Sequence, residues 1–458
     1  MNDVENESPR EAPRRSTVRD EALGILVRVE TDRAHAAPLL DARGAHFDLR
    51  DRGLLRALVK KVLRNVSRLD HVLSRNFDRK LASLDPAVRG GLRLGAAQLL
   101  LFERIPGHAA VGETVEAVKK AAPAAAGLVN AVLRNLARKE PRGAEVRFAA
   151  DASAAARLAL ETSNPEWLVS RWLAEFGEER ARAALFASQE DSPIDLLFDP
   201  RAGTAEEIER ELAARGVTVE ASPWAPYART VVAGDAAGHP LVASSRLAVV
   251  DAAAQAMCEL VEPADVVVDL AASPGGKTRT LLARGRARRV LALEPHRSRA
   301  SRLASNLAAA GRRDDVLVVR ADAGAPPLPR RAFRSVLLDA PCSGTGTLRK
   351  SPEIRWRLRE RHLPRFAAEQ RRLLASALEL LAAGGSLTYV TCSLEREENE
   401  DVVASVLAER SGFEVVAHEP SALPEPIREV AARGGVVRVL PGATNDGFSL
   451  ITIRARSQ

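Results

Sequence analysis

From residue 266 onward, short apolar runs alternate with amphipathic stretches along the chain. The run Val266–Asp269 is β-branched and ends in an acid, and a Pro-Gly-Gly turn then leads into a predicted helix, Thr278–Ala283. Further strands and helices are expected at Arg289–Leu293, Ser298–Ala310, Asp315–Val319, Ser335–Leu338, Gln370–Ala383 and Ser386–Val390. This alternation predicts a doubly wound α/β sheet, in which ligands bind beyond the carboxyl ends of the strands.

Residues 16–138 carry apolar positions at helical spacing throughout. Two amphipathic stretches come first, around Leu23–Glu30 and Leu54–Leu63. Pro106-Gly107 and Pro123 separate the later stretches, and helices are expected over Pro86–Phe102, Gly112–Ala121 and Gly127–Arg138. The pattern predicts a small all-α bundle.

The middle of the chain has a third pattern. Helix Glu166–Phe176 carries Trp167 and Trp172, which we expect in a core. A strand, a helix and a strand follow at Ile194–Phe198, Ala205–Arg215 and Val217–Glu220, which suggests a βαβ unit in a small α+β module. We therefore divide the chain into a disordered tail (1–15), a helical domain (16–140), a linker (141–160), a small α+β module (161–250) and an α/β domain (251–458). The net charge of +7 makes RNA binding the expected role of the helical domain and of the α+β module.

The chain of 458 residues is basic, with a net charge of +7 and a pI near 9.7. Such a balance favours a polyanionic partner, most simply nucleic acid. Lys60, Lys61 and Arg64 lie on the polar side of the second amphipathic stretch, where we expect RNA contact; an ordinary solvated face is the alternative.

No signal peptide is visible, and no apolar run reaches the roughly 18 residues that a membrane span requires. We therefore expect a monomeric cytoplasmic protein that uses no membrane. Its three cysteines, Cys258, Cys342 and Cys392, lie far apart without a Cys-x-x-Cys pair, so neither a disulfide framework nor a metal site is expected. Cys258 lies mid-helix among apolar residues and is expected to be buried.

Four acids follow the predicted strands of the α/β domain: Asp269, Glu294, Asp322 and Asp339. A single acid at a strand end is commonly a helix cap, but four in register suggest a nucleoside-type cofactor. The Pro-Gly-Gly turn has neither dinucleotide-fingerprint nor P-loop spacing, and no Mg²⁺-phosphate apparatus accompanies it. An adenosyl ligand is therefore favoured over a triphosphate.

Cys342 and Cys392 each follow the end of a predicted strand, and successive strand ends open onto one crevice. Cytosine C5 is a poor nucleophile toward a methyl sulfonium, but a thiolate added to C6 makes the ring an enamine that is nucleophilic at C5. A second group must then help to remove the C5 proton so that the enzyme is released. Two thiols beside a methyl donor suit these steps.

Four motifs resemble those of the RNA cytosine-C5 methyltransferases: Asp269–Thr278, Asp339–Gly346, Thr391–Ser393 and Asn445–Phe448. The helical bundle is similar to the antitermination factor NusB, and the resemblance covers residues 16 to 456. It implies a Rossmann-like domain that binds S-adenosyl-L-methionine, without a metal, and methylates cytosine C5 in small-subunit (16S) ribosomal RNA.

The resemblance also implies roles for single residues. Cys392 would be the nucleophile, Cys342 would assist product release, and Asp339 would line the cofactor and base site. Glu294 would hold the ribose and Asp322 would lie by the adenine. The cofactor loop would comprise Ala271, Ala272, Ser273, Pro274, Gly275, Gly276 and Lys277, and Gly346–Trp356 resembles the substrate-side segment, with Lys350, Ser351, Pro352, Glu353 and Arg355.

Some positions depart from the family's usual pattern: Ala271 stands for Cys, Ser273 for Ala, Glu294 for Asp, and Val250-Asp251 for Gln-Asp. These positions concern binding rather than the type of reaction. Two alternatives stay open: the same chemistry on transfer RNA or another ribosomal site, and a non-catalytic RNA-binding or antitermination-type protein.

Overall fold

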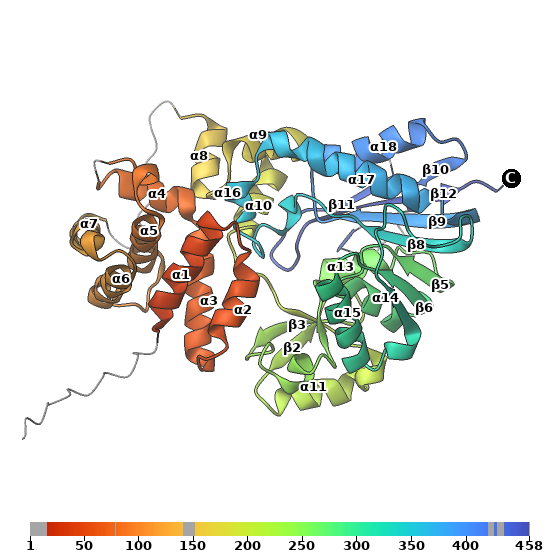
Figure 1. The fold of residues 1–458 in the computed structure, drawn as a ribbon, viewed down its shortest axis with the longest axis horizontal. Coiled ribbons are helices and arrows are strands. Elements are labelled where there is room, and N and C mark those ends of the chain that lie inside the picture. Colours follow the sequence, from red (N-terminus) through yellow and green to blue (C-terminus); the bar gives the residue numbers. More distant parts are fainter. Residues whose placement is uncertain (1–15, 78, 141–151, 420–425, 428–434, 458) are drawn as a thin grey trace, which may run out of the picture. The chain divides into compact units, whose positions relative to one another are not determined.

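The computed structural model describes residues 16–77, 79–140, 152–419, 426–427 and 435–457, so the predicted tail lies outside the described residues. The chain divides into two compact units, residues 1–166 and 167–458 (Figure 1). The first unit is helical: α1 (Val18–Thr31), α2 (Ala36–Gly44), α3 (Leu49–Arg64), α4 (Val66–Ser74), α5 (Pro86–Leu101), α6 (Gly107–Ala121), α7 (Ala126–Lys139) and α8 (Ala154–Glu161).

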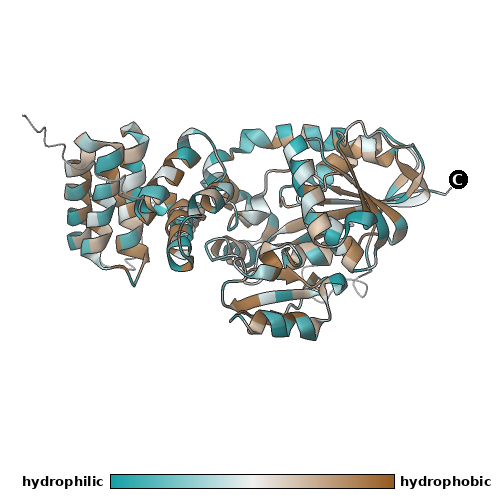
Figure 2. Ribbon diagram, turned by 60° about the horizontal axis from the view of Figure 1, so that its bottom comes forward, coloured by the Kyte–Doolittle hydropathy of each residue, from teal (hydrophilic) through white to brown (hydrophobic). Residues whose placement is uncertain are grey.

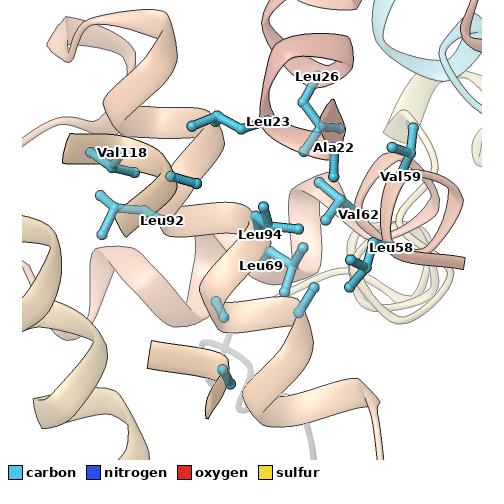
Figure 3. Close-up of a cluster of buried hydrophobic side chains, with 14 of the residues drawn as sticks. Ala22, Leu23, Leu26, Leu58, Val59, Val62, Leu69, Leu92, Leu94 and Val118 are labelled. Carbon is cyan, nitrogen blue, oxygen red and sulfur yellow. The ribbon is translucent and has the colours of Figure 1, made fainter. Parts of the chain in front are cut away.

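Helix α5 is the centre of the first unit and packs against α1, α3, α4, α6 and α7. Asp85 caps it by accepting a hydrogen bond from the N–H of Ala87, and Pro86 stands in its first turn. Its Gly91 and Gly95 allow close packing, because a Cβ at these positions would lie 2.3 Å from Val118 and from Leu133. Figure 3 shows the resulting core, to which α1, α3, α4, α5 and α6 all contribute leucine, valine or alanine side chains.

The predicted all-α bundle is confirmed, with three local differences. Helix α6 begins at Gly107 rather than Gly112, because Pro106 is its N-cap residue and the helix starts directly after it. Helix α8 lies in the stretch expected to be a linker, and α2 and α4 were not predicted. Arg64 is only 2% exposed, so it does not belong to an open basic face with Lys60 and Lys61.

The second unit begins with α9 (Glu166–Phe176) and α10 (Glu178–Ala187), which precede a small sheet. Trp172 is buried, as predicted, whereas Trp167 is only partly buried. The sheet comprises β1 (Asp195–Leu197), β2 (Thr218–Ala221), β3 (Ala228–Ala233) and β4 (Ala248–Val249), with helices α11 (Ala205–Ala213) and α12 (Pro240–Ala243) between strands.

The α+β character of this module is confirmed, but its strand order differs from a simple βαβ unit. The order is β2-β3-β1-β4, and all pairs are antiparallel. The unpredicted β3 therefore lies between the two predicted strands, β1 and β2, which run parallel to each other without pairing.

The larger sheet follows, built from β5 (Ala264–Asp269), β6 (Ala287–Leu293), β7 (Val316–Val319), β8 (Phe333–Asp339), β9 (Leu381–Thr391), β10 (Phe413–Val416), β11 (Val436–Val439) and β12 (Phe448–Ala455). The order is β10-β12-β9-β8-β5-β6-β7, and β11 pairs with β12. Strands β9, β8, β5, β6 and β7 are parallel, whereas β12 is antiparallel to β9. The chain reverses its direction of travel across the sheet between β5 and β8, which is where doubly wound folds bind ligands.

Helices cover both faces of this sheet (Figure 1). One side carries α13 (Ala252–Cys258), α14 (Gly276–Ala283) and α15 (Arg297–Ala309), and the other carries α17 (Leu363–Leu378) and α18 (Glu400–Ala408). Neighbouring strand residues serve opposite cores: Val267 packs on the first side and Val268 on the second. In Figure 2 the strands beside the C label are accordingly coloured mostly as hydrophobic.

The predicted doubly wound α/β fold is confirmed. The helix predicted over Gln370–Ala383 corresponds to α17, which ends earlier, at Leu378. Strand β9 already begins at Leu381, which pairs with Phe333 of β8. Cys258 is buried as predicted, although it is the last residue of α13 rather than mid-helix. Among the described helices, none has the length and apolar character needed to cross a membrane.

Candidate active site

The switch point between β5 and β8 gathers the central acids of the predicted site. Asp269 is the last residue of β5 and Asp339 the last of β8. Lys277, in the first turn of α14, places its Nζ 2.6 Å from Oδ2 of Asp339 and lies over the ring of Phe448. The lysine and the acid therefore form one ion pair at this edge of the sheet.

The predicted cofactor loop connects β5 to α14. Gly275 has φ +109°, and a Cβ there would lie 2.9 Å from Leu303, so only glycine suits this turn. The loop is tied down at both sides, because Ala272 donates its N–H to the carbonyl of Leu293 and Asn306 donates to the carbonyl of Pro274. The first-turn N–H groups of α14 lie next to this turn, an arrangement suited to polar or anionic ligand groups.

Asp269 is an unusual carboxylate. It is 1% exposed, its Oδ2 accepts a hydrogen bond from the hydroxyl of Thr278 at 2.7 Å, and its Oδ1 accepts none within the described residues. Burial raises the pKa of this carboxyl to about 6, despite the Thr278 bond. A buried acceptor without a donor is costly, and a ligand N–H or O–H would satisfy it.

The two outer acids differ from each other. Glu294 follows β6, is buried, and accepts the N–H of His296 at 2.9 Å. Asp322, beyond β7, is half exposed, and Arg372 of α17 donates to both its oxygens at 2.8 and 3.0 Å. These hydrogen bonds hold the pKa of Asp322 below its usual value. Four acids along the ends of β8, β5, β6 and β7 fit an extended ligand with hydroxyl and amino groups, as an adenosyl amino acid has.

The two cysteines meet beside these acids. Cys342 follows β8 and Cys392 follows β9, and their Sγ atoms are 3.3 Å apart. The hydrogen bond from the Cys342 thiol lowers the pKa of Cys392, and the ammonium of Lys277 acts in the same direction. The same bond, together with burial, raises the pKa of Cys342. The contact thus shifts the two thiols in opposite directions, with a lowered pKa at Cys392 and a raised pKa at Cys342.

The predicted substrate-side segment is anchored by a buried ionic cluster. Nζ of Lys350 lies 2.9 Å from Asp251 and 2.6 Å from Asp446, and Arg349 donates to the other oxygen of Asp446 at 2.6 Å. Gly346 touches the Asn-Asp-Gly-Phe motif directly: it accepts the N–H of Gly447 at 2.8 Å. The structure therefore brings together the Asp339–Gly346 motif, the substrate-side segment Gly346–Trp356 and the Asn445–Phe448 motif.

Sequence reasoning missed one buried residue of the site, Glu398. Its carboxylate accepts hydrogen bonds from Ser343 and Ser393, the residues that follow the two cysteines. No local pattern marks it, because four glutamates fall within residues 395–400, and only the fold buries Glu395 and Glu398 and directs the Glu398 carboxylate to the two serines.

Within the described ranges, no group of three or more His, Cys, Asp or Glu side chains is arranged to hold a metal ion. The acids and thiols of the site are instead spread along successive strand ends.

Family comparisons follow the order of the chain. Residues 16–138 match the NusB family, residues 164–233 match the ferredoxin-like domain of RsmF/B-like methyltransferases, and residues 257–453 match the 16S rRNA methyltransferase RsmB/F family.

Two relatives match this chain over nearly their whole length. The probable ribosomal RNA small subunit methyltransferase B of Bacillus subtilis is 30% identical over 460 residues, which is 97% of this chain and 100% of that protein. The ribosomal RNA small subunit methyltransferase B of Thermus thermophilus is 35% identical over 444 residues, covering 94% and 97% of the two chains. The crystal structure of PH0851 shares the fold, with a TM-score of 0.78 at 22% identity over 96% of this chain and 99% of that one.

Proposed function

Because the chain belongs to the 16S rRNA methyltransferase RsmB/F family, we propose that it methylates C5 of a cytosine in small-subunit ribosomal RNA, with S-adenosylmethionine as the methyl donor. The observation that carries this proposal is the pair of thiols 3.3 Å apart, Cys342 and Cys392, at neighbouring strand ends. An ordinary methyltransferase that methylates an oxygen or an amine needs no such pair, whereas C5 methylation needs a nucleophile and a proton acceptor.

The donor would lie along the carboxyl ends of β5 and its neighbours. Residues 271–277 would form its loop, with Glu294 at the ribose, Asp322 by the adenine and Asp339 between donor and base. Asp269 supports this assignment, since its buried Oδ1 needs a donor. When bound, S-adenosylmethionine supplies an electrophilic methyl group.

Cys392 would begin the reaction. Its thiolate adds to C6 of the target cytosine, so that the S–C6 bond forms and the electron pair of the C5–C6 double bond makes C5 nucleophilic. The lowered pKa of Cys392 supports this role, because Lys277 and the Cys342 thiol both stabilise the thiolate. The base must leave its stack to reach the strand ends, so unpaired cytosines should react fastest.

Cys342 would complete the reaction after C5 has received the methyl group. It helps to remove the proton from C5, the electron pair of the C5–H bond restores the C5–C6 double bond, and the C6–S bond breaks to release Cys392. Cys342 must first pass its own thiol proton to solvent, and its raised pKa makes the resulting thiolate a strong base for the C5 proton.

Separate replacement of the two cysteines tests the proposal. Cys392→Ala should abolish methyl transfer and form no covalent RNA adduct. The Cys342→Ala variant should still attack and methylate the cytosine but fail to release the RNA. With labelled RNA and S-adenosylmethionine, a covalent protein–RNA species that migrates more slowly on a denaturing gel should therefore accumulate.

Two outcomes would contradict this assignment. If the covalent protein–RNA adduct accumulates in Cys392→Ala but not in Cys342→Ala, the two cysteines have the opposite roles. Activity without an adduct in either variant or in the double variant would exclude covalent catalysis. Bisulfite sequencing of ribosomal and transfer RNA, from cells with and without the protein, identifies the target and tests the alternatives of another RNA or no catalysis.

A further inference from the structure

Glu398 lies at the end of a short 3₁₀ turn, Arg396–Glu398, directly behind the two cysteine loops. It is 0% exposed. Oε2 accepts the N–H of Ser343 at 2.8 Å and the amide of Gln370 at 3.0 Å, while Oε1 accepts the hydroxyls of Ser343 and Ser393, the latter at 2.6 Å. One carboxylate thus joins the loop after β8 to the loop after β9.

The proton count shows that the carboxylate is the centre of this cluster. Each serine hydroxyl has one proton, and both point to Oε1 of Glu398. Ser393 Oγ then acts as an acceptor for the N–H of Glu395 at 3.2 Å. The two hydroxyl oxygens are also 3.1 Å apart, so without Glu398 the serine hydroxyls could join the loops only through one bond between themselves.

The turn that carries Glu398 is itself fixed. Tyr389 of β9 donates its hydroxyl to the carbonyl of Glu398 at 2.6 Å. Asn399 donates to the carbonyls of Ser393 and Glu395 and accepts from Thr391 at 2.7 Å. The carboxylate is therefore a rigid anchor rather than a mobile side chain.

We propose that Glu398 is a positioning residue, which fixes the spacing of Cys342 and Cys392 by accepting hydrogen bonds from the serine that follows each of them. Its kinetic consequence rests on the proposed methyl transfer, but the spacing itself does not. The two cysteines lie in separate loops, 50 residues apart in the chain, with their Sγ atoms 3.3 Å apart. The N–H of Gly346 also bonds to the carbonyl of Cys392, but Glu398 is the group that binds the residues directly after both cysteines.

Glu398 also places a charge near the thiols. Besides the bond to Cys342 and burial, the pKa of Cys392 responds to three charges: Asp339 on β8 and Glu398 raise it, and Lys277 on α14 lowers it. The pKa of Cys342 is likewise raised by its bond to Cys392, by burial, by Glu398 and by Asp339. Removing the charge of Glu398 should therefore lower the pKa of Cys392 further. If Glu398 acted only by joining the loops, this pKa would not change.

Substitutions at this site separate the tie from the charge. Glu398→Gln keeps a tie, because its amide can turn so that Oε1 accepts from Ser343 N–H and Gln370 while the NH₂ donates to the two hydroxyls. Glu398→Ala removes every bond. Ser343→Ala removes one bond and provides a milder variant if Glu398→Ala fails to fold. Glu397→Gln is the matched control, since Glu397 carries the same charge but bonds to Arg171 instead.

Two measurements on the full chain need no RNA. The first is the rate at which diamide oxidises Cys342 and Cys392 to a disulfide, with two electrons and two protons passing to diamide. Glu398→Ala should slow this oxidation at least tenfold and Ser343→Ala less, while Glu398→Gln should not slow it. The second is the pH dependence of Cys392 alkylation by iodoacetamide, followed by peptide mass spectrometry. Its midpoint should move to lower pH in Glu398→Gln and stay at the wild-type value in Glu397→Gln.

Methyl transfer to ribosomal RNA is measured in parallel, and a misplaced nucleophile should lower it roughly 100-fold in Glu398→Ala. The inference is overturned if Glu398→Ala and Ser343→Ala are both oxidised at the wild-type rate. It is also overturned if Glu398→Gln keeps the wild-type alkylation midpoint and Glu398→Ala keeps wild-type methyl transfer. If the wild-type protein methylates no cytosine C5 while oxidation is still slowed in the variants, the proposed function fails and the positioning role stands.

Discussion

Gly346 is the point where two motifs of the site touch through their backbones. A Cβ at this position would lie 2.2 Å from the carbonyl oxygen of Gly447 and 2.6 Å from its carbonyl carbon. Gly346 also donates its N–H to the carbonyl of Cys392 at 2.9 Å. Substitution by alanine therefore forces apart the chain segments that carry Cys392 and the Asn-Asp-Gly-Phe motif.

The cost of Gly346→Ala follows from these contacts. The methyl group needs about 1 Å of backbone movement, since ordinary contacts begin at 3.4 Å. Overpacking costs about 1–3 kcal/mol, and weakening the two hydrogen bonds of Gly346 adds about 1 kcal/mol. We expect the free energy of unfolding of the second unit to fall by about 2–4 kcal/mol. Displacement of Cys392 should lower methyl transfer roughly 100-fold.

Tryptophan fluorescence during urea unfolding measures this loss selectively. The four tryptophans, Trp167, Trp172, Trp224 and Trp356, all belong to the second unit. Gly112→Ala in α6 of the first unit is the control: no atom lies within 4 Å of its Cβ position, so it should leave the fluorescence transition unchanged. A Gly346→Ala protein with the wild-type urea midpoint and wild-type methyl transfer would refute the close backbone contact.

Three further outcomes are expected. Burial raises the pKa of Asp269 from 3.8 to about 6, so the wild type should be most stable relative to Asp269→Asn below pH 3.8. This difference in the free energy of unfolding should fall by at most about 3 kcal/mol as the pH rises through 6. A pH-independent difference in the same fluorescence assay would contradict the burial argument. Asp322→Ala should weaken S-adenosylmethionine binding roughly 10- to 100-fold in calorimetry through loss of a charged hydrogen bond, and unchanged affinity would remove Asp322 from the site. Lys60→Gln with Lys61→Gln should lower the log–log salt slope of RNA binding by at most about two units, while an unaltered slope would show that this face is only solvated surface.

Periodicity and strand-end chemistry predicted much of the second unit. Strands β5 to β9 were recognisable because each is a short apolar run, and Cys342 and Cys392 could be brought together because parallel strands end at one edge. The lowered pKa of Cys392 could not be predicted, since it depends on a thiol and an ammonium that only the fold places nearby.

Other features left little trace in the sequence. The short helices α2 and α4 contain too few turns to show a clear period, and β3 could be recognised only through its partners β1 and β2. Arg64 looked like part of a basic face, but its neighbours Leu63 and Val66 are buried with it at the junction of α3 and α4. Burial of a charged residue follows from tertiary contacts, which local hydropathy does not reveal.

The place of β12 in the sheet has a consequence for how the protein is made. This strand, Phe448–Ala455, lies between β9 and β10 and also pairs with β11. Strand β9, which Cys392 follows, therefore has a free edge until β12 has been translated. The helical unit depends on contacts within its own 166 residues and can fold while the rest is being synthesised. A nascent chain therefore acquires a folded amino-terminal unit before its thiol pair is in place, because the sheet that positions Cys342 and Cys392 is complete only after translation has supplied β12.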